Sequence, residues 1–404
     1  MKVFRVHQKL ISNPLQDISA EVHAQLESQI RTVPSGEVAI TVGSRGISNL
    51  AQIVRACGDW LRSKGAQPFI VPAMGSHNGA TAEGQRAMVE SLGITEAAMN
   101  MPIRASMEVV EIGKVRTGPV FMDRYCFEAA GVLVLNRIKL HTCFAGPIQS
   151  GLTKMMVVGM GKIRSAQTFH SARPAAMKDM LLEMGQFVLD SGKIIGGIGI
   201  LEDGYDQTAE LHALAPGDIL RREAELLEHH RSYFPRLPVD DLNVLIVRTI
   251  GKTYSGTGMD TNVIGRRGIH DFEDLVTPRI RVIAALELSA SSQGNALGVG
   301  NADFITQRLR GSIDEHKTLI NTLTTGDMDR AKIPATLKDD QTVVQVIGER
   351  YGAQRWMFIP NTLHLETLFV TGDLKQELES HRLCSVDPEP VDVTFDAGKL
   401  SLAF

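Results

Sequence analysis

The sequence predicts an α/β enzyme of two lobes, each built from a β-sheet with flanking helices. Short apolar runs at residues 38–42, 69–71 and 131–136 end in glycine and polar residues, as buried strands of a parallel sheet do. Segments with helical periodicity, at 47–61 and 81–91, separate these runs. A chain of 404 residues is also long enough for two domains.

We expect a first lobe over residues 1–237 and a second over 238–404, because a proline-rich stretch at 235–238 marks a boundary. The active site is expected in the cleft between the lobes, and the last strands could pack back on the first lobe. In the helix at 47–61, Ser48 is the expected N-cap and Gly65 the stop. Further expected strands lie at 109–112, 119–122, 193–201, 242–247 and 282–288, and further helices at 177–189 and 219–233.

Composition limits the class of protein. Hydrophobic residues make up 43% of the chain and charged residues 22%, which is ordinary for a soluble globular enzyme. A net charge of −4 gives no basic field for nucleic acid. The four cysteines have no C-x-x-C spacing, so neither a zinc ribbon nor a disulfide scaffold is indicated. The chain has no run of 18 apolar residues and no apolar signal core, so we expect a cytoplasmic protein without a membrane partner.

Polar side chains follow the first three expected strands. Arg45 follows the first, His77 the second and His141 the third. In a parallel sheet these three ends lie on one edge, so a cation and two imidazoles would converge there. Such a set suits an anionic substrate from which a proton or a hydride is moved.

A lysine and a further histidine come after the third strand. Lys154 follows a short turn that contains Gly151, where the absence of a side chain lets the backbone approach a ligand. His170 comes sixteen residues later. Imidazoles on either side of the lysine offer proton transfer or metal ligation, although no standard metal motif has this spacing. Placement of all three on solvated loops is the alternative.

The order of these residues resembles the nickel-pincer lactate racemase family. The shared pattern is an arginine after the first strand, Gly-x-His after the second, His-x-x-Phe-Ala-Gly after the third, then Ser-Gly-x-x-Lys and a later histidine. It covers residues 36–175 well and the rest of the chain in outline. The resemblance implies a racemase or epimerase of a 2-hydroxy acid, an isomerase that works by reversible hydride transfer.

The resemblance also implies a cofactor and a role for each site residue. The cofactor is pyridinium-3,5-bisthiocarboxylic acid mononucleotide, the nickel-pincer nucleotide, bound covalently through Lys154. Two sulfurs and a carbon of the cofactor hold nickel together with His170. His77 and His141 are then alternating bases on the two faces of the substrate, and Arg45 binds the substrate carboxylate. Ser44 and Gly151 are expected beside the cofactor.

In the second lobe, polar residues of the glycine-rich loop after the strand at 242–247 are candidates to reach the nucleotide end of the cofactor. They are Lys252, Asp260, Asn262 and Arg266. The chain also departs from the lactate racemases: Pro147, Ile148 and Gln149 read as an insertion, and an arginine beside the tethering lysine is lost. These changes leave the hydroxy acid open.

Two other functions remain open from the sequence. One is a non-catalytic protein that binds nickel or the pincer nucleotide, although such a protein has no need of both His77 and His141. The other is an NAD-dependent oxidoreductase, because Gly159-x-Gly161 resembles a dinucleotide fingerprint that lacks its third glycine. Expected partners are a small-molecule hydroxy acid and, transiently, the cofactor-biosynthesis enzymes, in a monomer or homodimer. Protein from a host without those enzymes is expected to lack the cofactor.

Overall fold

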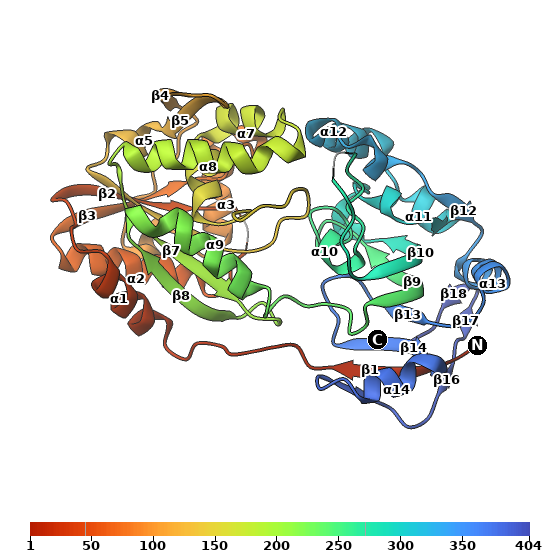
Figure 1. Ribbon diagram of the computed structural model, residues 1–404. Helices are drawn as coiled ribbons and strands as arrows, with labels where there is room; N and C mark the ends of the chain where they lie inside the picture. The colour runs from red at the N-terminus through yellow and green to blue at the C-terminus, as the bar shows by residue number, and fades with distance from the viewer. Residues whose placement is uncertain (45, 271) are drawn as a thin grey trace. The chain divides into compact units, whose positions relative to one another are not determined.

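The computed structural model describes residues 1–44, 46–270 and 272–404, which form two compact α/β units (Figure 1). The first unit is Ile11–Phe234, and the second combines Met1–Leu10 with Pro235–Phe404. The first ten residues therefore belong with the C-terminal part of the chain, not with the lobe in which the sequence placed them. The reason is backbone pairing, because β1 (Lys2–Gln8) runs antiparallel to β14 (Thr367–Thr371).

A five-stranded sheet in the order β3-β2-β6-β7-β8 forms the centre of the first unit. Its first four strands are parallel and β8 is antiparallel to β7, so β2, β3 and β6 end on the same edge, as predicted. The strands are β2 (Gly36–Val42), β3 (Ala66–Pro72), β6 (Gly131–Arg137), β7 (Ile194–Glu202) and β8 (Thr208–Leu214).

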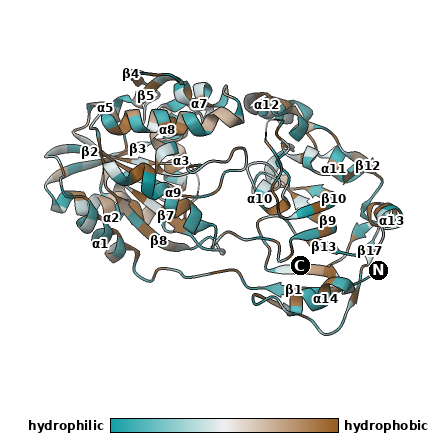
Figure 2. Ribbon diagram, viewed as in Figure 1, coloured by the Kyte–Doolittle hydropathy of each residue, from teal (hydrophilic) through white to brown (hydrophobic). Residues whose placement is uncertain are grey.

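Helices cover both faces of this sheet. Ile40 and Leu133 belong to a core shared with α1, α2 and α3, whereas Ala39 and Val132 belong to a core shared with α7, α8 and α9. Because successive strand residues point to opposite faces and helices cover both, the middle of each of these strands is mainly apolar. Figure 2 shows hydrophilic and hydrophobic residues mixed along the helices that cover them. The helices are α1 (Ile18–Gln29), α2 (Leu50–Ser63), α3 (Ala82–Ser91), α4 (Glu96–Met99), α5 (Arg124–Glu128), α7 (Lys162–His170), α8 (Pro174–Asp190) and α9 (Ile219–His230). A separate hairpin pairs β4 (Val109–Val115) with β5 (Gly118–Asp123).

Capping residues in the sequence account for the C-terminal end of α2 and the N-terminal end of α3, but the predicted N-cap of α2 is wrong. Gly65 follows α2 with φ +84°, the left-handed conformation that commonly ends a helix, and Thr81 caps α3 by accepting from Gly84 N–H. Ser48 is not the N-cap of α2, which is Asn49. The Ser48 N–H instead donates to the buried Glu202 carboxylate at 2.6 Å, because tertiary contacts outweigh the local capping preference.

The second unit is built on a nine-stranded sheet in the order β12-β11-β10-β9-β13-β14-β1-β15, with β16 paired to β1. The strands from β12 to β13 are parallel, and those beyond are antiparallel. Trp356 is fully buried in β13. Besides β1 and β14, the strands are β9 (Asp241–Ile250), β10 (Arg279–Leu288), β11 (Phe304–Thr306), β12 (Ala335–Leu337), β13 (Trp356–Ile359), β15 (Cys384–Val386) and β16 (Val391–Asp392). The helices are α10 (Thr261–Ile264), α11 (Gln307–Gly311), α12 (Glu315–Thr325), α13 (Asp340–Tyr351) and α14 (Lys375–Glu379).

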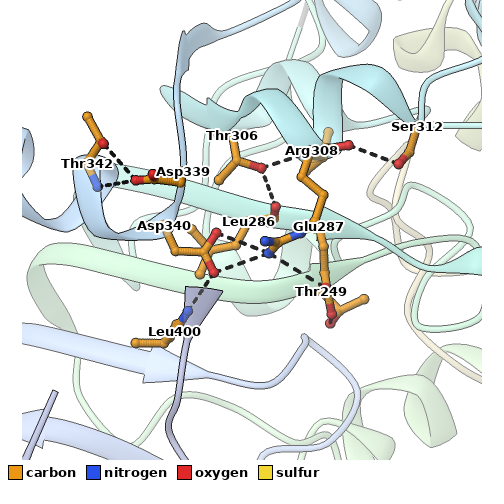
Figure 3. Close-up of polar contacts among 11 residues, drawn as sticks. Thr249, Leu286, Glu287, Thr306, Arg308, Ser312, Asp339, Asp340, Thr342 and Leu400 are labelled. Carbon is orange, nitrogen blue, oxygen red and sulfur yellow. Dashed lines mark hydrogen bonds and ion pairs between the residues drawn. The ribbon is translucent and has the colours of Figure 1, made fainter. Parts of the chain in front are cut away.

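A charged cluster ties the elements of the second unit together (Figure 3). Arg308 of α11 lies 3.1 and 3.2 Å from the two carboxylate oxygens of Asp340, at the start of α13, and 3.7 Å from Glu287 of β10. Asp340 also accepts from the Leu400 N–H at 2.8 Å, which fixes the hairpin of β17 (Phe395–Asp396) and β18 (Lys399–Leu400). Thr249 donates to Glu287 at 2.7 Å. The cluster is a structural junction.

None of the helices in the described residues is both long enough and apolar enough to cross a membrane.

Candidate functional site

The loops after β2 and β3 bring Ser44 and His77 together. Ser44 Oγ and His77 Nδ1 form a hydrogen bond, although the two residues are 33 positions apart. Their contact follows from the parallel pairing of the two strands, which end side by side. His77 is an exposed residue. Arg45, the expected carboxylate-binding residue, lies outside the described residues.

His141 follows β6 and is held by its neighbours at both backbone and ring. Its N–H donates to Gln149 Oε1 at 2.7 Å, and its Nδ1 accepts from the Cys143 N–H at 3.0 Å. The Phe144 ring packs against the imidazole with centroids 4.4 Å apart. Gln149 is buried and was missed as a site residue, because in the sequence it read only as part of an insertion.

Lys154 lies directly against His141. Its Nζ is 2.8 Å from His141 Nε2. The lysine closes the short helical turn α6 (Leu152–Lys154), which continues as a π-helical turn (Met155–Gly159) and then as α7. π-Helical turns are rare and are frequent at functional sites. The sequence predicted a short glycine turn before Lys154, and the structure places the lysine at the end of a short helical turn.

The π-helical turn also contacts the loops after β2 and β3. The Gly75 N–H, two residues before His77, donates to Gly159 O at 3.2 Å. A Cβ placed on Gly43, beside Ser44, would lie 3.3 Å from Met155 Cε. The structure therefore brings Ser44 against His77, and Lys154 against His141, at the edge of the sheet where the parallel strands β2, β3 and β6 end.

A buried carboxylate lies beneath the turn that carries Lys154. Glu223 of α9 accepts from Thr153 N–H at 2.9 Å and Thr153 Oγ1 at 2.6 Å, while its Oε1 has no hydrogen-bond partner in the described part of the chain. Burial raises the pKa of Glu223 to about 7, and the two hydrogen bonds from Thr153 oppose that rise. Glu223 was missed, although it falls on the apolar stripe of its helix with Ile219 and Leu226.

Gly151 is explained by this carboxylate. A Cβ at position 151 would lie 2.1 Å from Glu223 Oε1, so a side chain there would clash with the buried Glu223 carboxylate unless one of the two moved. The φ of Gly151 is 173°, an extended conformation open to every residue, so close approach rather than backbone freedom requires glycine. The close contact in the structure is with Glu223.

His170 ends α7 with a half-buried ring. Burial, and secondarily the charge of Lys154, lower the pKa of His170 to about 4. The imidazole is therefore neutral at pH 7, the protonation state in which histidine binds metals. Edge-to-face contacts run from Phe144 to Phe169, at 5.9 Å, and from Phe169 to His170, at 5.5 Å, so the two site histidines share one aromatic support.

Lys162 is a fully buried cation that fixes the loop before His77. Its Nζ lies 3.1 Å from the buried Asp123 carboxylate, donates to Gln85 Oε1 at 3.1 Å, and also donates to Pro72 O. Gln85 in turn donates to Gly75 O at 2.9 Å. Burial raises the pKa of Asp123, and the charge of Lys162 opposes that rise.

The dinucleotide-fingerprint reading does not fit this structure. Gly159 belongs to the π-helical turn and Gly161 immediately precedes α7, so both lie within a helical run rather than between a strand and a helix. The fingerprint works through a strand-to-helix turn whose glycines approach a pyrophosphate. A Cβ on Gly159 would instead meet Met155 and Ala73 O, which explains the glycine by packing.

Metal binding by protein side chains alone is not supported in the described residues, where no group of three or more His, Cys, Asp or Glu side chains could hold a metal ion. The neutral ring of His170 and the nearby primary amine of Lys154 fit a cofactor that is tethered at one residue and shares its metal with the other.

The remaining candidates lie in the second unit. Lys252 Nζ donates to Asn321 at 2.8 Å, and the Asp260 carboxylate accepts from Asn262 N–H at 2.9 Å, which caps α10. The guanidinium of Arg266 contacts Asp303 at 2.8 Å and the carbonyl oxygens of Asn301, Ile280 and Arg281. These contacts give Arg266 a structural function.

Comparison with known proteins supports the fold. No protein-family model matches the chain, and no curated protein matches its sequence. Among solved structures, it is similar to the lactate racemase apoprotein from Thermoanaerobacterium thermosaccharolyticum, with a TM-score of 0.56 and 15% identity over 90% of this chain and 99% of that one. A protein from Thermotoga maritima is also similar, with a TM-score of 0.51 and 12% identity over 80% of this chain and 84% of that one. The chain has a lactate racemase-like fold.

Proposed function

We propose that this protein is a racemase or epimerase of a 2-hydroxy acid that uses a nickel-pincer nucleotide tethered to Lys154. One observation carries the proposal: Lys154 Nζ lies 2.8 Å from His141 Nε2, at the strand edge that also presents His77. The lactate racemase-like fold supports the same reaction class. His170, neutral at pH 7, would be the protein ligand to nickel.

The division of chemistry follows from the substrate. The α-hydrogen of a 2-hydroxy acid is very weakly acidic, and the bound cofactor supplies a site that accepts it as hydride and returns it. The protein must take the hydroxyl proton and give it back on either face of a planar 2-keto acid. That requirement explains two histidines, with His77 and His141 on opposite faces. Arg45 would bind the carboxylate through paired N–H donors.

Residues around His77 and His141 have supporting functions in this proposal. Ser44 orients the ring of His77 through Nδ1, and Gln149 fixes the backbone of His141. Lys252, Asp260 and Asn262 are proposed contacts for the nucleotide part of the cofactor. Gly151 remains a proposed neighbour of the cofactor beside its established contact with Glu223.

The test is to produce the chain together with the cofactor-biosynthesis enzymes and to measure intact mass, nickel content and interconversion of 2-hydroxy acid enantiomers by chiral chromatography. Wild-type protein should carry a covalent adduct and about one nickel, and should racemise or epimerise at least one acid of the panel. Lys154→Ala should lose the adduct, whereas His170→Ala should keep the adduct and lose nickel. Adduct and nickel without turnover on any acid would favour the non-catalytic binding protein, and an adduct on another lysine would refute the tether.

A further inference from the structure

The hydrogen bonds of His141 define which of its nitrogens carries a proton. Its Nδ1 lies 3.0 Å from the backbone nitrogen of Cys143, and a backbone N–H can only donate. Nδ1 must therefore accept, which leaves the proton of the neutral ring on Nε2. This conclusion depends on a main-chain donor and not on any choice of side-chain tautomer.

Lys154 contacts the ring nitrogen that carries this proton. Its Nζ lies 2.8 Å from His141 Nε2, a nitrogen that donates in this tautomer. An ammonium group has three donors and no lone pair, so it cannot accept that bond, whereas a neutral amine can. We infer that, before any cofactor is attached, His141 holds Lys154 as a neutral, nucleophilic amine that is ready for acylation. With Lys154 neutral, burial alone lowers the pKa of His170, and burial is the larger of its two causes.

The structure around the pair favours this state. Lys154 and His141 are both partly buried, and burial disfavours the charged form of an amine. The His141 ring packs against Phe144 with centroids 4.4 Å apart, and the His141 backbone N–H donates to Gln149 at 2.7 Å. Below the turn, the Thr153 N–H and hydroxyl are bonded to Glu223, which orients the lysine-bearing turn. These contacts limit movement of the His141 ring or of the Lys154 turn, and one of the two would have to move to accommodate an ammonium group at Lys154.

The electrophile for such an amine is an activated acyl or thioacyl group. After rotation about Cε–Nζ releases the lone pair from Nε2–H, Nζ attacks the carbonyl or thiocarbonyl carbon and the C–N bond forms. The leaving group departs with the electron pair of its bond to that carbon and takes one amine proton. The products are an amide or thioamide at Lys154 and the protonated leaving group, so atoms and charge balance. Only the identity of this electrophile rests on the proposed function.

One consequence concerns turnover. A base that uses Nε2 needs a lone pair on that nitrogen, so the proton of the neutral ring must then lie on Nδ1. The Cys143 N–H bond to Nδ1 is incompatible with that tautomer. Acylation of Lys154 removes the amine that accepts from Nε2, and we infer that it releases His141 from the attachment state into the state needed for proton transfer.

The first test uses the full chain from a host without cofactor-biosynthesis enzymes, in which Lys154 is unmodified. Trace acetic anhydride at pH 6 to 10, with peptide mass spectrometry, gives the acylation rate of each lysine. An ordinary lysine, with a pKa of about 10.4, is neutral in roughly one molecule in 2,500 at pH 7. Lys154 should react at least about tenfold faster than the exposed Lys178 at pH 7, and its rate should level off at lower pH.

Matched variants isolate the role of His141. His141→Phe keeps a ring against Phe144 and removes Nε2–H, so Lys154 should lose at least about tenfold in rate at pH 7. His229→Phe, which changes an exposed histidine that pairs with Glu210 in the same unit, should leave the Lys154 profile unchanged. A Lys154 profile that levels off only near pH 10, or that is unaltered in His141→Phe, would overturn the inference. Because the chain carries no cofactor, neither result depends on whether the racemase proposal holds.

The second test needs no variant that might misfold. Ring nitrogen NMR of ¹⁵N-histidine-labelled wild-type protein, with His141→Phe for assignment only, should show the His141 ring protonated on Nε2 and not on Nδ1 at pH 7. Protonation on Nδ1, or on both nitrogens, would contradict a neutral Lys154.

Discussion

Two polar clusters of this molecule are built at the ends of parallel strands, yet they use their charges in different ways. In the second unit, Arg308 and Asp340 pair with each other and join two helices and the terminal hairpin (Figure 3). In the first unit, His141 and Lys154 meet nitrogen to nitrogen, and no opposite charge neutralises either in that contact.

The charges of the contacting groups distinguish a structural cluster from a reactive one. A guanidinium and a carboxylate in contact satisfy each other, so their removal is expected to change stability alone. A neutral imidazole and an amine in contact keep groups that can exchange protons or form bonds. The predictions below, from the largest expected effect to the smallest, test whether the two clusters divide in this way.

The largest effect is expected on turnover of the cofactor-loaded enzyme. His77→Ala and His141→Ala should each lower kcat by about 10²- to 10⁴-fold, because each removes a positioned proton acceptor. His229→Ala is the control, since that exposed histidine of the same unit pairs with Glu210. Racemisation rates measured by chiral chromatography would decide. A loss in His229→Ala equal to those of the site variants would indicate a general loss of folding.

The next effect is expected on stability, from the buried cation beneath the His77 loop. Lys162→Met should lower the free energy of unfolding by about 3–5 kcal/mol, because it leaves the buried Asp123 without its counter-charge. Urea denaturation measures the change, with Lys178→Met as an exposed control. Lys162→Met combined with Asp123→Asn should recover part of the loss. A change below about 1 kcal/mol in the single variant would show that Asp123 is already neutral in the folded protein.

Glu223 should make stability depend on pH. Its folded pKa of about 7 lies above the unfolded value of 4.5, so its contribution is fully present below pH 4.5 and is lost as the pH rises through 7. The loss across that window is about 3 kcal/mol. Urea denaturation of wild type and Glu223→Gln between pH 4.5 and 8 compares the slopes, and the variant should be flatter. Identical slopes would mean that Glu223 titrates normally.

The smallest effect is expected in the second unit. Arg308→Met should lower the free energy of unfolding by about 1–3 kcal/mol, less than a fully buried pair because Arg308 is 27% exposed. Acetylation of Lys154 should be unchanged in this variant, measured below the denaturation transition. A change in Lys154 reactivity as large as that of His141→Phe would break the distinction between the two clusters.

Much of the first unit could be predicted from the sequence because its strands are mainly apolar and end in polar loops. That pattern predicted that Arg45, His77 and His141 follow strands that end at one sheet edge, and the strands before them do end there. Glu223 and Lys162 could not be predicted as partners, since their contacts join residues 70 and 39 positions apart across the fold. In the same way, β1 could not be assigned to the second unit, because its partner β14 lies at the other end of the chain.

The stereochemistry of single turnovers tests the central claim, that His77 and His141 serve opposite faces of the substrate. Each cofactor-loaded variant, His77→Ala or His141→Ala, is mixed in molar excess with one pure enantiomer of the substrate. The reaction is quenched after a single turnover, and the 2-keto acid that has formed is trapped as a hydrazone. The account predicts that each variant still oxidises one enantiomer and that the reactive enantiomer differs between the two. Oxidation of the same enantiomer by both variants, or of both enantiomers by either, would contradict it.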